Sequence, residues 1–107
     1  MRLAELRKVG VRGGERLVRV YDFDVDMAPA RYMAFFLYED RPGVVGAVGT
    51  MLGSAGINIA SMEVGRKEAG GPALMGITVD SPIPGPVLAE IARAVGAQRA
   101  RSLVLPA

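Results

Sequence analysis

A short glycine-rich turn near the middle of the chain constrains the fold more than any other feature. The apolar run 32–37 leads into E-D-R-P-G-V-V-G at residues 39–46, and G-I-N-I-A follows at residues 56–60. The run predicts a strand, Pro42-Gly43 predicts the opening of a helix, and Asn58 predicts the start of a second strand. We therefore expect a carboxylate, helix-start N–H groups and an amide side chain near one edge of a small sheet, an arrangement suited to a zwitterion.

From Tyr32 onward the pattern predicts the order strand, helix, strand, strand, helix, strand. The expected strands are residues 32–39, 57–66, 73–80 and 98–105. The first helix is expected to start around Pro42, with Asp40 or Arg41 as its cap, and the two helices to end at Gly56 and Gly96. This order predicts an α+β fold of the ferredoxin-like βαββαβ plan, with a four-stranded antiparallel sheet and both helices on one face.

Residues 1–31 are expected to form a β-hairpin or extended segment that precedes this domain of residues 32–107. Two β-prone runs, 3–11 and 16–26, flank R-G-G-E at residues 12–15, and Gly-Gly between such runs is a hairpin signal. A two-stranded hairpin is marginal alone in water, so it should pack on the rest of the chain, a partner subunit or a neighbouring domain. The D-x-D-x-D pattern at residues 22–26 lacks the Gly and Glu of a calcium loop, and we interpret it as the solvated face of a strand.

Oligomerisation is expected from the strands, which are apolar on both faces in places. Met33 and Phe35 alternate with Ala34 and Phe36, although helices should cover only one face of the sheet. The opposite face and the sheet edges would then be poorly covered. The simplest solution is a two-fold dimer.

Composition narrows the possible chemistry. The chain has 107 residues, a net charge of +2 and neither cysteine nor histidine, which excludes thiol and imidazole catalysis and nearly every zinc site. No block of basic residues indicates nucleic acid as a partner. We expect no signal peptide and no membrane span, and the absence of cysteine fits a reducing cytoplasm.

Glycines at positions 43, 46, 49 and 53 form a smooth strip on the first predicted helix. Each interior glycine costs roughly 1 kcal/mol relative to alanine, so the strip indicates close approach of another backbone or a ligand. The spacing matches neither the dinucleotide-binding G-x-G-x-x-G motif nor a P-loop. The basic residues of a KH loop and the stacking aromatics of an RNA-recognition motif are also missing.

These motifs, in this order and spacing, resemble the C-terminal ACT domain of D-3-phosphoglycerate dehydrogenases. The residues that carry the resemblance are E-D-R-P-G-V-V-G at 39–46, G-I-N-I-A at 56–60, V-G-R at 64–66, G-G-P-A-L-M at 70–75 and V-D at 79–80. The resemblance covers residues 32–105. Residues 16–29 also look like the strand that, in the long form of the enzyme, returns from the intervening domain, so residues 1–31 would be the end of that domain.

The resemblance implies a regulatory site rather than an active site, and no cofactor in this chain, although the parent family uses NAD. In that family the ACT domain binds L-serine at a subunit interface and binding lowers dehydrogenase activity. The ligand lies between the turn after the first strand and the start of the second strand of a neighbouring chain. The matching positions are Tyr38, Asp40 and Asn58. Some members carry His and Asn where this chain has Tyr38 and Asp40.

The chemistry of these residues suits an amino acid. Asp40 can pair with an ammonium, and Asn58 can donate to a carboxylate and accept from an ammonium. The N–H groups of Gly43 and Val44 favour the carboxylate, and the Tyr38 hydroxyl can donate or accept. Structural roles are also open: Asp40 as a helix cap, Asn58 as a turn residue and Tyr38 as a strand-end aromatic.

We therefore predict a non-catalytic module of a dehydrogenase that senses L-serine or another small amino acid, forms a homo-oligomer and acts on attached catalytic domains. The main alternative is an assembly module with no effector. A small hydrolase on the same scaffold would need a phosphate-binding constellation that Arg41 alone does not supply. Arg66 is expected to face the turn at residues 70–71 and is assigned no ligand role.

Overall fold

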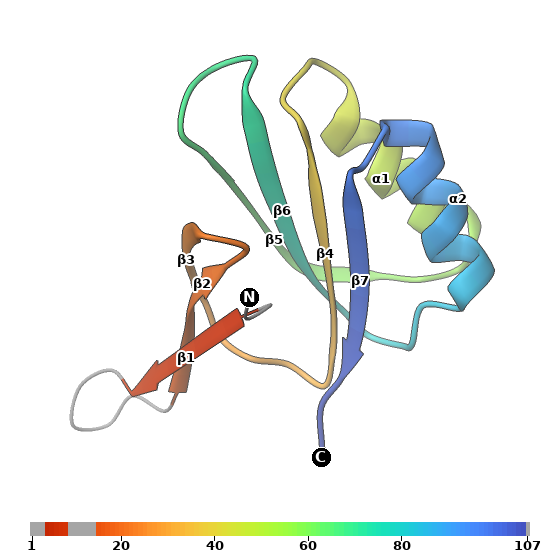
Figure 1. Ribbon diagram of the computed structural model, residues 1–107. Coiled ribbons are helices and arrows are strands. Elements are labelled where there is room, and N and C mark those ends of the chain that lie inside the picture. The colour runs from red at the N-terminus through yellow and green to blue at the C-terminus, as the bar shows by residue number, and fades with distance from the viewer. Residues whose placement is uncertain (1–3, 9–14, 107) are drawn as a thin grey trace.

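The computed structural model describes residues 4–8 and 15–106, which form two antiparallel sheets and two helices (Figure 1). The larger sheet has the strand order β5-β6-β4-β7. Its strands are β4 (Tyr32–Glu39), β5 (Ile59–Arg66), β6 (Pro72–Val79) and β7 (Arg99–Val104). All neighbouring strands are antiparallel. The ferredoxin-like βαββαβ prediction is confirmed: β4 has the predicted bounds, and the bounds of the other three strands differ from the predicted ones by at most two residues.

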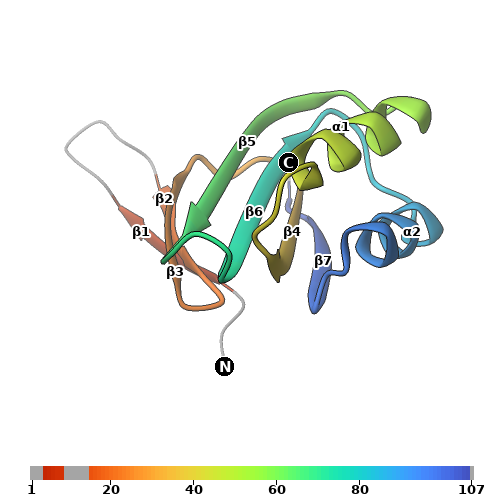
Figure 2. The same cartoon turned by 90° about the horizontal axis from the view of Figure 1, so that it is seen from above.

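Two helices cover one face of this sheet, as Figure 2 shows from above. They are α1 (Val44–Ser54) and α2 (Gly85–Val95). The apolar stripe of α1 buries Val44, Val48 and Leu52, whereas Val45 is 47% exposed. Gly96 adopts φ 67° directly after α2, which confirms the predicted left-handed stop.

The predicted start of the first helix is wrong. Gly43, and neither Asp40 nor Arg41, occupies the cap position, and no side chain caps the helix. The angles of Gly43, φ 93° and ψ −13°, match the third residue of a type II turn, which Pro42 precedes as the second residue. A residue with positive φ cannot continue into a right-handed helix, so α1 begins at Val44.

In the described part of the N-terminal region, residues 4–8 and 15–31, the chain forms three strands and not the predicted two. They are β1 (Ala4–Lys8), β2 (Glu15–Val20) and β3 (Phe23–Met27), in the order β1-β2-β3. The run 16–26 is interrupted because Tyr21 and Asp22 both have positive φ, at 47° and 65°, as in the two-residue turn of a tight hairpin. Neither residue is glycine, so this turn lacks the glycine that usually marks a tight hairpin in a sequence. Residues 12–14 of the predicted Gly-Gly turn lie outside the described residues.

The N-terminal sheet packs on the helix-free face of the larger sheet, so the molecule has two hydrophobic cores on either side of it. The core beneath the helices contains Phe36, Leu52 and Ile91, among others. The second core joins the two sheets and consists of Leu17, Val20, Phe23, Met27, Met33, Phe35 and Leu74. These strands are apolar on both faces because the same chain covers both faces. The uncovered face from which we predicted a dimer is therefore occupied.

Glycine at position 76 permits this docking. A Cβ atom there would lie 2.6 Å from Met27 Sδ and 3.2 Å from Phe35 Cε1. Polar contacts add to the junction: the Asp26 N–H donates to Glu63 Oε1 at 3.0 Å, and Lys67 Nζ lies 5.0 Å from the centre of the Phe23 ring. The N-terminal sheet is thus in direct apolar and polar contact with the larger sheet.

Candidate functional site

The turn after β4 is tied to the hairpin turn between β5 and β6. The Asp40 N–H donates to the carbonyl of Gly71 at 2.9 Å. Asp40 Oδ2 accepts from Arg66 Nη1 at 2.7 Å and from the Gly70 N–H at 3.4 Å. These hydrogen bonds hold the pKa of the Asp40 carboxyl below its usual value, although partial desolvation acts in the opposite direction. Asp40 is therefore a fixed, ionised group at this end of the sheet.

An open hollow of about 450 Å³ lies at this turn. It is lined by Asp40, Arg41, Pro42, Arg66, Ala69 and Gly70. Its volume falls within the usual range for small-molecule sites, roughly 300–1,000 Å³. The hollow contains one carboxylate and two guanidinium groups, so it offers partners for both charges of a zwitterion.

Two predicted site residues at the start of α1 lie next to this turn. Gly43 is exposed, whereas the Val44 side chain is buried in the core beneath the helices. Val44 can therefore offer a ligand its backbone N–H but not its side chain. The first N–H groups of a helix have no partner within the helix, which makes this end suitable for an anion.

Tyr38 is 1% exposed and belongs to the core beneath the helices. Burial, and secondarily the negative charge of Asp40, raises the pKa of its hydroxyl. Within one chain, Tyr38 is therefore a core residue that lies two residues before Asp40, at the start of the turn after β4.

Asn58 is far from Asp40, so the expectation that both groups lie near one edge of the sheet within a chain is wrong. Strands β4 and β5 both run antiparallel to β6 and hence parallel to each other. Asp40 follows the end of β4, while Asn58 precedes the start of β5, which lies level with the start of β4. The length of β4 separates them, about 25 Å at the usual rise per residue. Asn58 Nδ2 donates to Asp80 Oδ2 at 2.7 Å.

Arg66 is the residue that sequence reasoning missed at this site. We expected it to face the turn at residues 70–71 and gave it no ligand role, yet it binds Asp40. The register of the sheet explains this contact. On one side of β6, Arg66 of β5 pairs with Ala73, and on the other side Ala73 pairs with Tyr38 of β4, two residues before Asp40. That relation depends on the strand order, which the sequence pattern does not contain.

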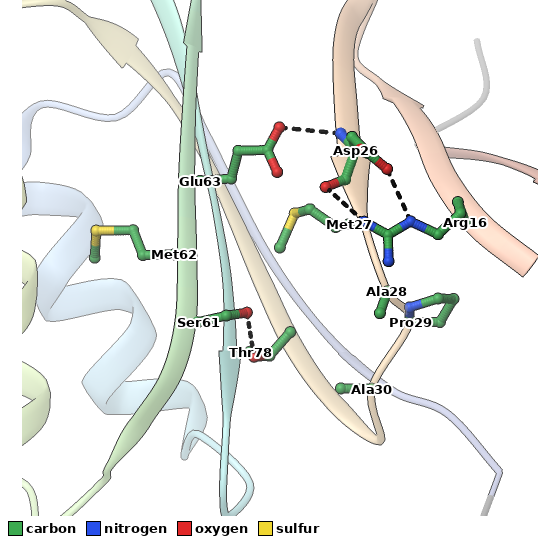
Figure 3. Close-up of a pocket in the computed structure, with 10 residues that line it drawn as sticks. All are labelled: Arg16, Asp26, Met27, Ala28, Pro29, Ala30, Ser61, Met62, Glu63 and Thr78. Atoms are coloured by element: carbon green, nitrogen blue, oxygen red, sulfur yellow. Dashed lines mark hydrogen bonds and ion pairs between the residues drawn. The ribbon is translucent and has the colours of Figure 1, made fainter. Parts of the chain in front are cut away.

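A second cavity, of about 330 Å³, lies where the β3–β4 connection crosses β5 and β6 (Figure 3). Its polar groups bind one another: Arg16 Nε donates to Asp26 Oδ1 at 2.8 Å, and the hydroxyls of Ser61 and Thr78 lie 2.6 Å apart. Figure 3 shows Met62 pointing away from these groups, toward the helices. This cavity is best explained as part of the junction between the two sheets.

Comparison with known proteins identifies the family. Residues 32–96 match the ACT domain, that is, more than half of the chain, including every residue that lines the hollow. The chain belongs to the ACT domain family. Among the residues that the structure describes, no helix of this ACT protein is long and apolar enough to cross a membrane.

Similar proteins are D-3-phosphoglycerate dehydrogenases. The chain is 41% identical to the dehydrogenase from Synechocystis sp. over 93 residues, and this match covers 87% of the chain and 17% of the dehydrogenase. It is 40% identical to the Bacillus subtilis dehydrogenase, over 73% of the chain and 15% of that protein. It is 41% identical to the Methanocaldococcus jannaschii dehydrogenase, over 70% of the chain and 14% of that protein. The chain thus spans about a sixth of the length of these relatives and corresponds to their ACT regulatory domain.

Proposed function

We propose that this ACT domain binds L-serine at a subunit interface and mediates feedback inhibition of a D-3-phosphoglycerate dehydrogenase. The observation that carries the proposal is the hollow beside Asp40, where an ionised carboxylate and two arginine side chains meet, close in sequence to the start of α1. Such a set of groups can satisfy an ammonium and a carboxylate at once. The dehydrogenase names of the similar proteins supply the metabolic context.

The site is completed by a second chain. Strand β5 is an edge of the larger sheet, and Val64 on it is 40% exposed. If two β5 strands pair antiparallel around a two-fold axis near Met62, Asn58 of the partner subunit lies opposite Arg66, because each is four residues from the centre. The amide that lies about 25 Å from Asp40 within one chain then reaches the hollow of the other chain.

The glycine strip of α1 fits the same assembly. Cβ atoms added at Gly46, Gly49 and Gly53 would meet nothing within 4 Å, so no close approach within the described chain requires these glycines. In a dimer through the β5 edges, the helix-covered faces of both sheets continue side by side. The strip is then available for close approach of the partner subunit.

Regulation would follow from unequal binding to two dimer arrangements. Serine held by groups from both chains stabilises the arrangement in which those groups are close together. The N-terminal sheet and any attached catalytic domains respond to that arrangement. Such coupling between sites is typically about 1–3 kcal/mol.

An assembly module without an effector is the second candidate, and one observation favours it. Asn58 is bonded to Asp80, and Asp40 is bonded to Arg66, so both side chains already have partners within the chain. Binding serine through Asn58 requires that its bond to Asp80 be exchanged for a bond to the ligand. An assembly module would keep both bonds and bind no amino acid.

Calorimetric titration of L-serine into the purified chain separates the two candidates, with glycine, D-serine and L-valine as controls. We expect saturable, stereospecific binding that Asn58→Ala weakens by at least tenfold while dimer formation persists. Asp80→Asn keeps a hydrogen-bond acceptor for Asn58 and serves as the matched control, which should bind serine. No heat from any amino acid, at concentrations where the chain is dimeric, would leave assembly as the function.

A further inference from the structure

We propose that Arg66 binds the carboxylate of the effector directly, and that Asp40 positions Arg66 while accepting the ammonium. This inference rests on the effector-binding function proposed above. It assigns a ligand-binding role to a residue that the sequence analysis left without one, and it makes the ion pair between Asp40 and Arg66 the recognition element for the zwitterion.

The geometry of the ion pair leaves both partners with capacity for a ligand. Arg66 contacts Asp40 through Nη1 alone, whereas a guanidinium carries five N–H donors. The two contacts of the Asp40 carboxylate both fall on Oδ2, so Oδ1 can accept an ammonium without loss of the Arg66 bond. The Arg66 side chain is 54% exposed and that of Asp40 is 20% exposed, which places the guanidinium nearer to an incoming ligand.

The charge of the hollow favours a carboxylate. Of the residues that line it, Asp40 contributes −1 and Arg41 and Arg66 contribute +1 each, a net charge of +1. A ligand with only an ammonium would meet a carboxylate that Arg66 already neutralises. A carboxylate would meet two guanidinium groups, and arginine binds carboxylates through paired, charge-assisted hydrogen bonds.

The position of Arg66 also agrees with a two-subunit site. In the antiparallel β5 pair proposed above, Asn58 of the partner subunit would lie opposite Arg66. The ligand would lie between an amide from one chain and an Asp–Arg pair from the other. Removal of the Arg66 charge should therefore impair carboxylate recognition, while the dimer itself persists.

The test is calorimetric titration of three ligands into the purified chain: L-serine, serinol, which lacks the carboxylate, and glycerate, which lacks the ammonium. We expect the wild-type chain to bind L-serine best and glycerate better than serinol. Arg66→Met should weaken L-serine binding at least tenfold and abolish the preference for glycerate over serinol. Arg66→Lys keeps the positive charge but not the paired N–H donors, so its affinity for L-serine should lie between those of the wild type and Arg66→Met. Arg101→Met on exposed strand β7 changes the net charge equally and should bind like wild type.

Thermal unfolding of each variant separates a folded, non-binding variant from a misfolded one. If Arg66→Met binds L-serine as well as Arg101→Met does, or more tightly, Arg66 does not bind the carboxylate and the inference is overturned, while the effector function stands. If the wild-type chain binds none of the three ligands, the effector function fails and this inference fails with it.

Discussion

Packing of Met27 against Gly76 makes the most direct test of the fold, because it joins the N-terminal sheet to the ACT sheet. In Gly76→Ala, the new Cβ would lie 2.6 Å from Met27 Sδ and 3.2 Å from Phe35 Cε1. Both side chains are buried, at 4% and 0% exposure, so neither can move into solvent without loss of packing. Overpacking of this kind costs about 1–3 kcal/mol of the free energy of unfolding.

The clash in Gly76→Ala is opposed by a favourable change in the unfolded chain, and the larger of the two effects decides whether the substitution destabilises. Replacement of a strand glycine by alanine stabilises by about 0.5–1 kcal/mol, because the unfolded chain loses conformational freedom. The clash exceeds this gain, so Gly76→Ala should destabilise the chain by about 1 kcal/mol. Met27→Ala alone should cost about 2–5 kcal/mol. In that background the clash is absent and the new methyl group fills part of the cavity, so Gly76→Ala should become neutral or stabilising.

Urea denaturation of the four members of this double-mutant cycle measures the coupling energy, which should be about 1–2 kcal/mol. Gly65→Ala is the matched control on a neighbouring strand, because its Cβ would meet only the carbonyl oxygen of Asp24, at the ordinary contact distance of 3.5 Å, and it should stabilise the chain by about 0.5–1 kcal/mol. If Gly76→Ala is as stable as wild type in both backgrounds, the N-terminal sheet does not pack on the ACT sheet as described.

Three further predictions concern the candidate site and the proposed dimer. The hydrogen bond from Arg66 lowers the pKa of Asp40, so the stabilisation from this pair is present above the usual carboxyl pKa and is lost as the pH falls through the lower, folded-state pKa. In Arg66→Met, carbon-13 NMR titration should find the Asp40 pKa nearer its usual value. Burial raises the pKa of Tyr38, so the stabilisation from its neutral hydroxyl is complete below pH about 10 and is lost as the pH rises through the folded-state pKa. Tyr38→Phe removes this titration and should flatten the alkaline part of the curve of unfolding free energy against pH, measured by urea denaturation. Val64→Lys on the β5 edge should dissociate the dimer in light scattering after size-exclusion chromatography, whereas Val104→Lys on the opposite edge strand should not, and equal masses for both variants would argue against pairing through β5.

Local sequence patterns were sufficient to predict most elements of the ACT domain. Apolar periodicity predicted the order of strands and helices after Tyr32, and Gly96 marked the end of α2. The motif at residues 39–46 located the turn at which the hollow lies. These features depend on residues within a few positions of one another, where backbone preference and side-chain spacing are decisive.

Which residues contact one another across the fold depends on the three-dimensional arrangement of the strands. Arg66 meets Asp40 because the strand order β5-β6-β4 brings together residues that are 26 positions apart. The same strand directions place Asn58 at the opposite end of the sheet. The N-terminal sheet covers a face that the sequence pattern could assign equally well to a partner subunit. Alternation of apolar residues indicates that a face is buried but not what buries it, because that choice depends on contacts between distant parts of the chain.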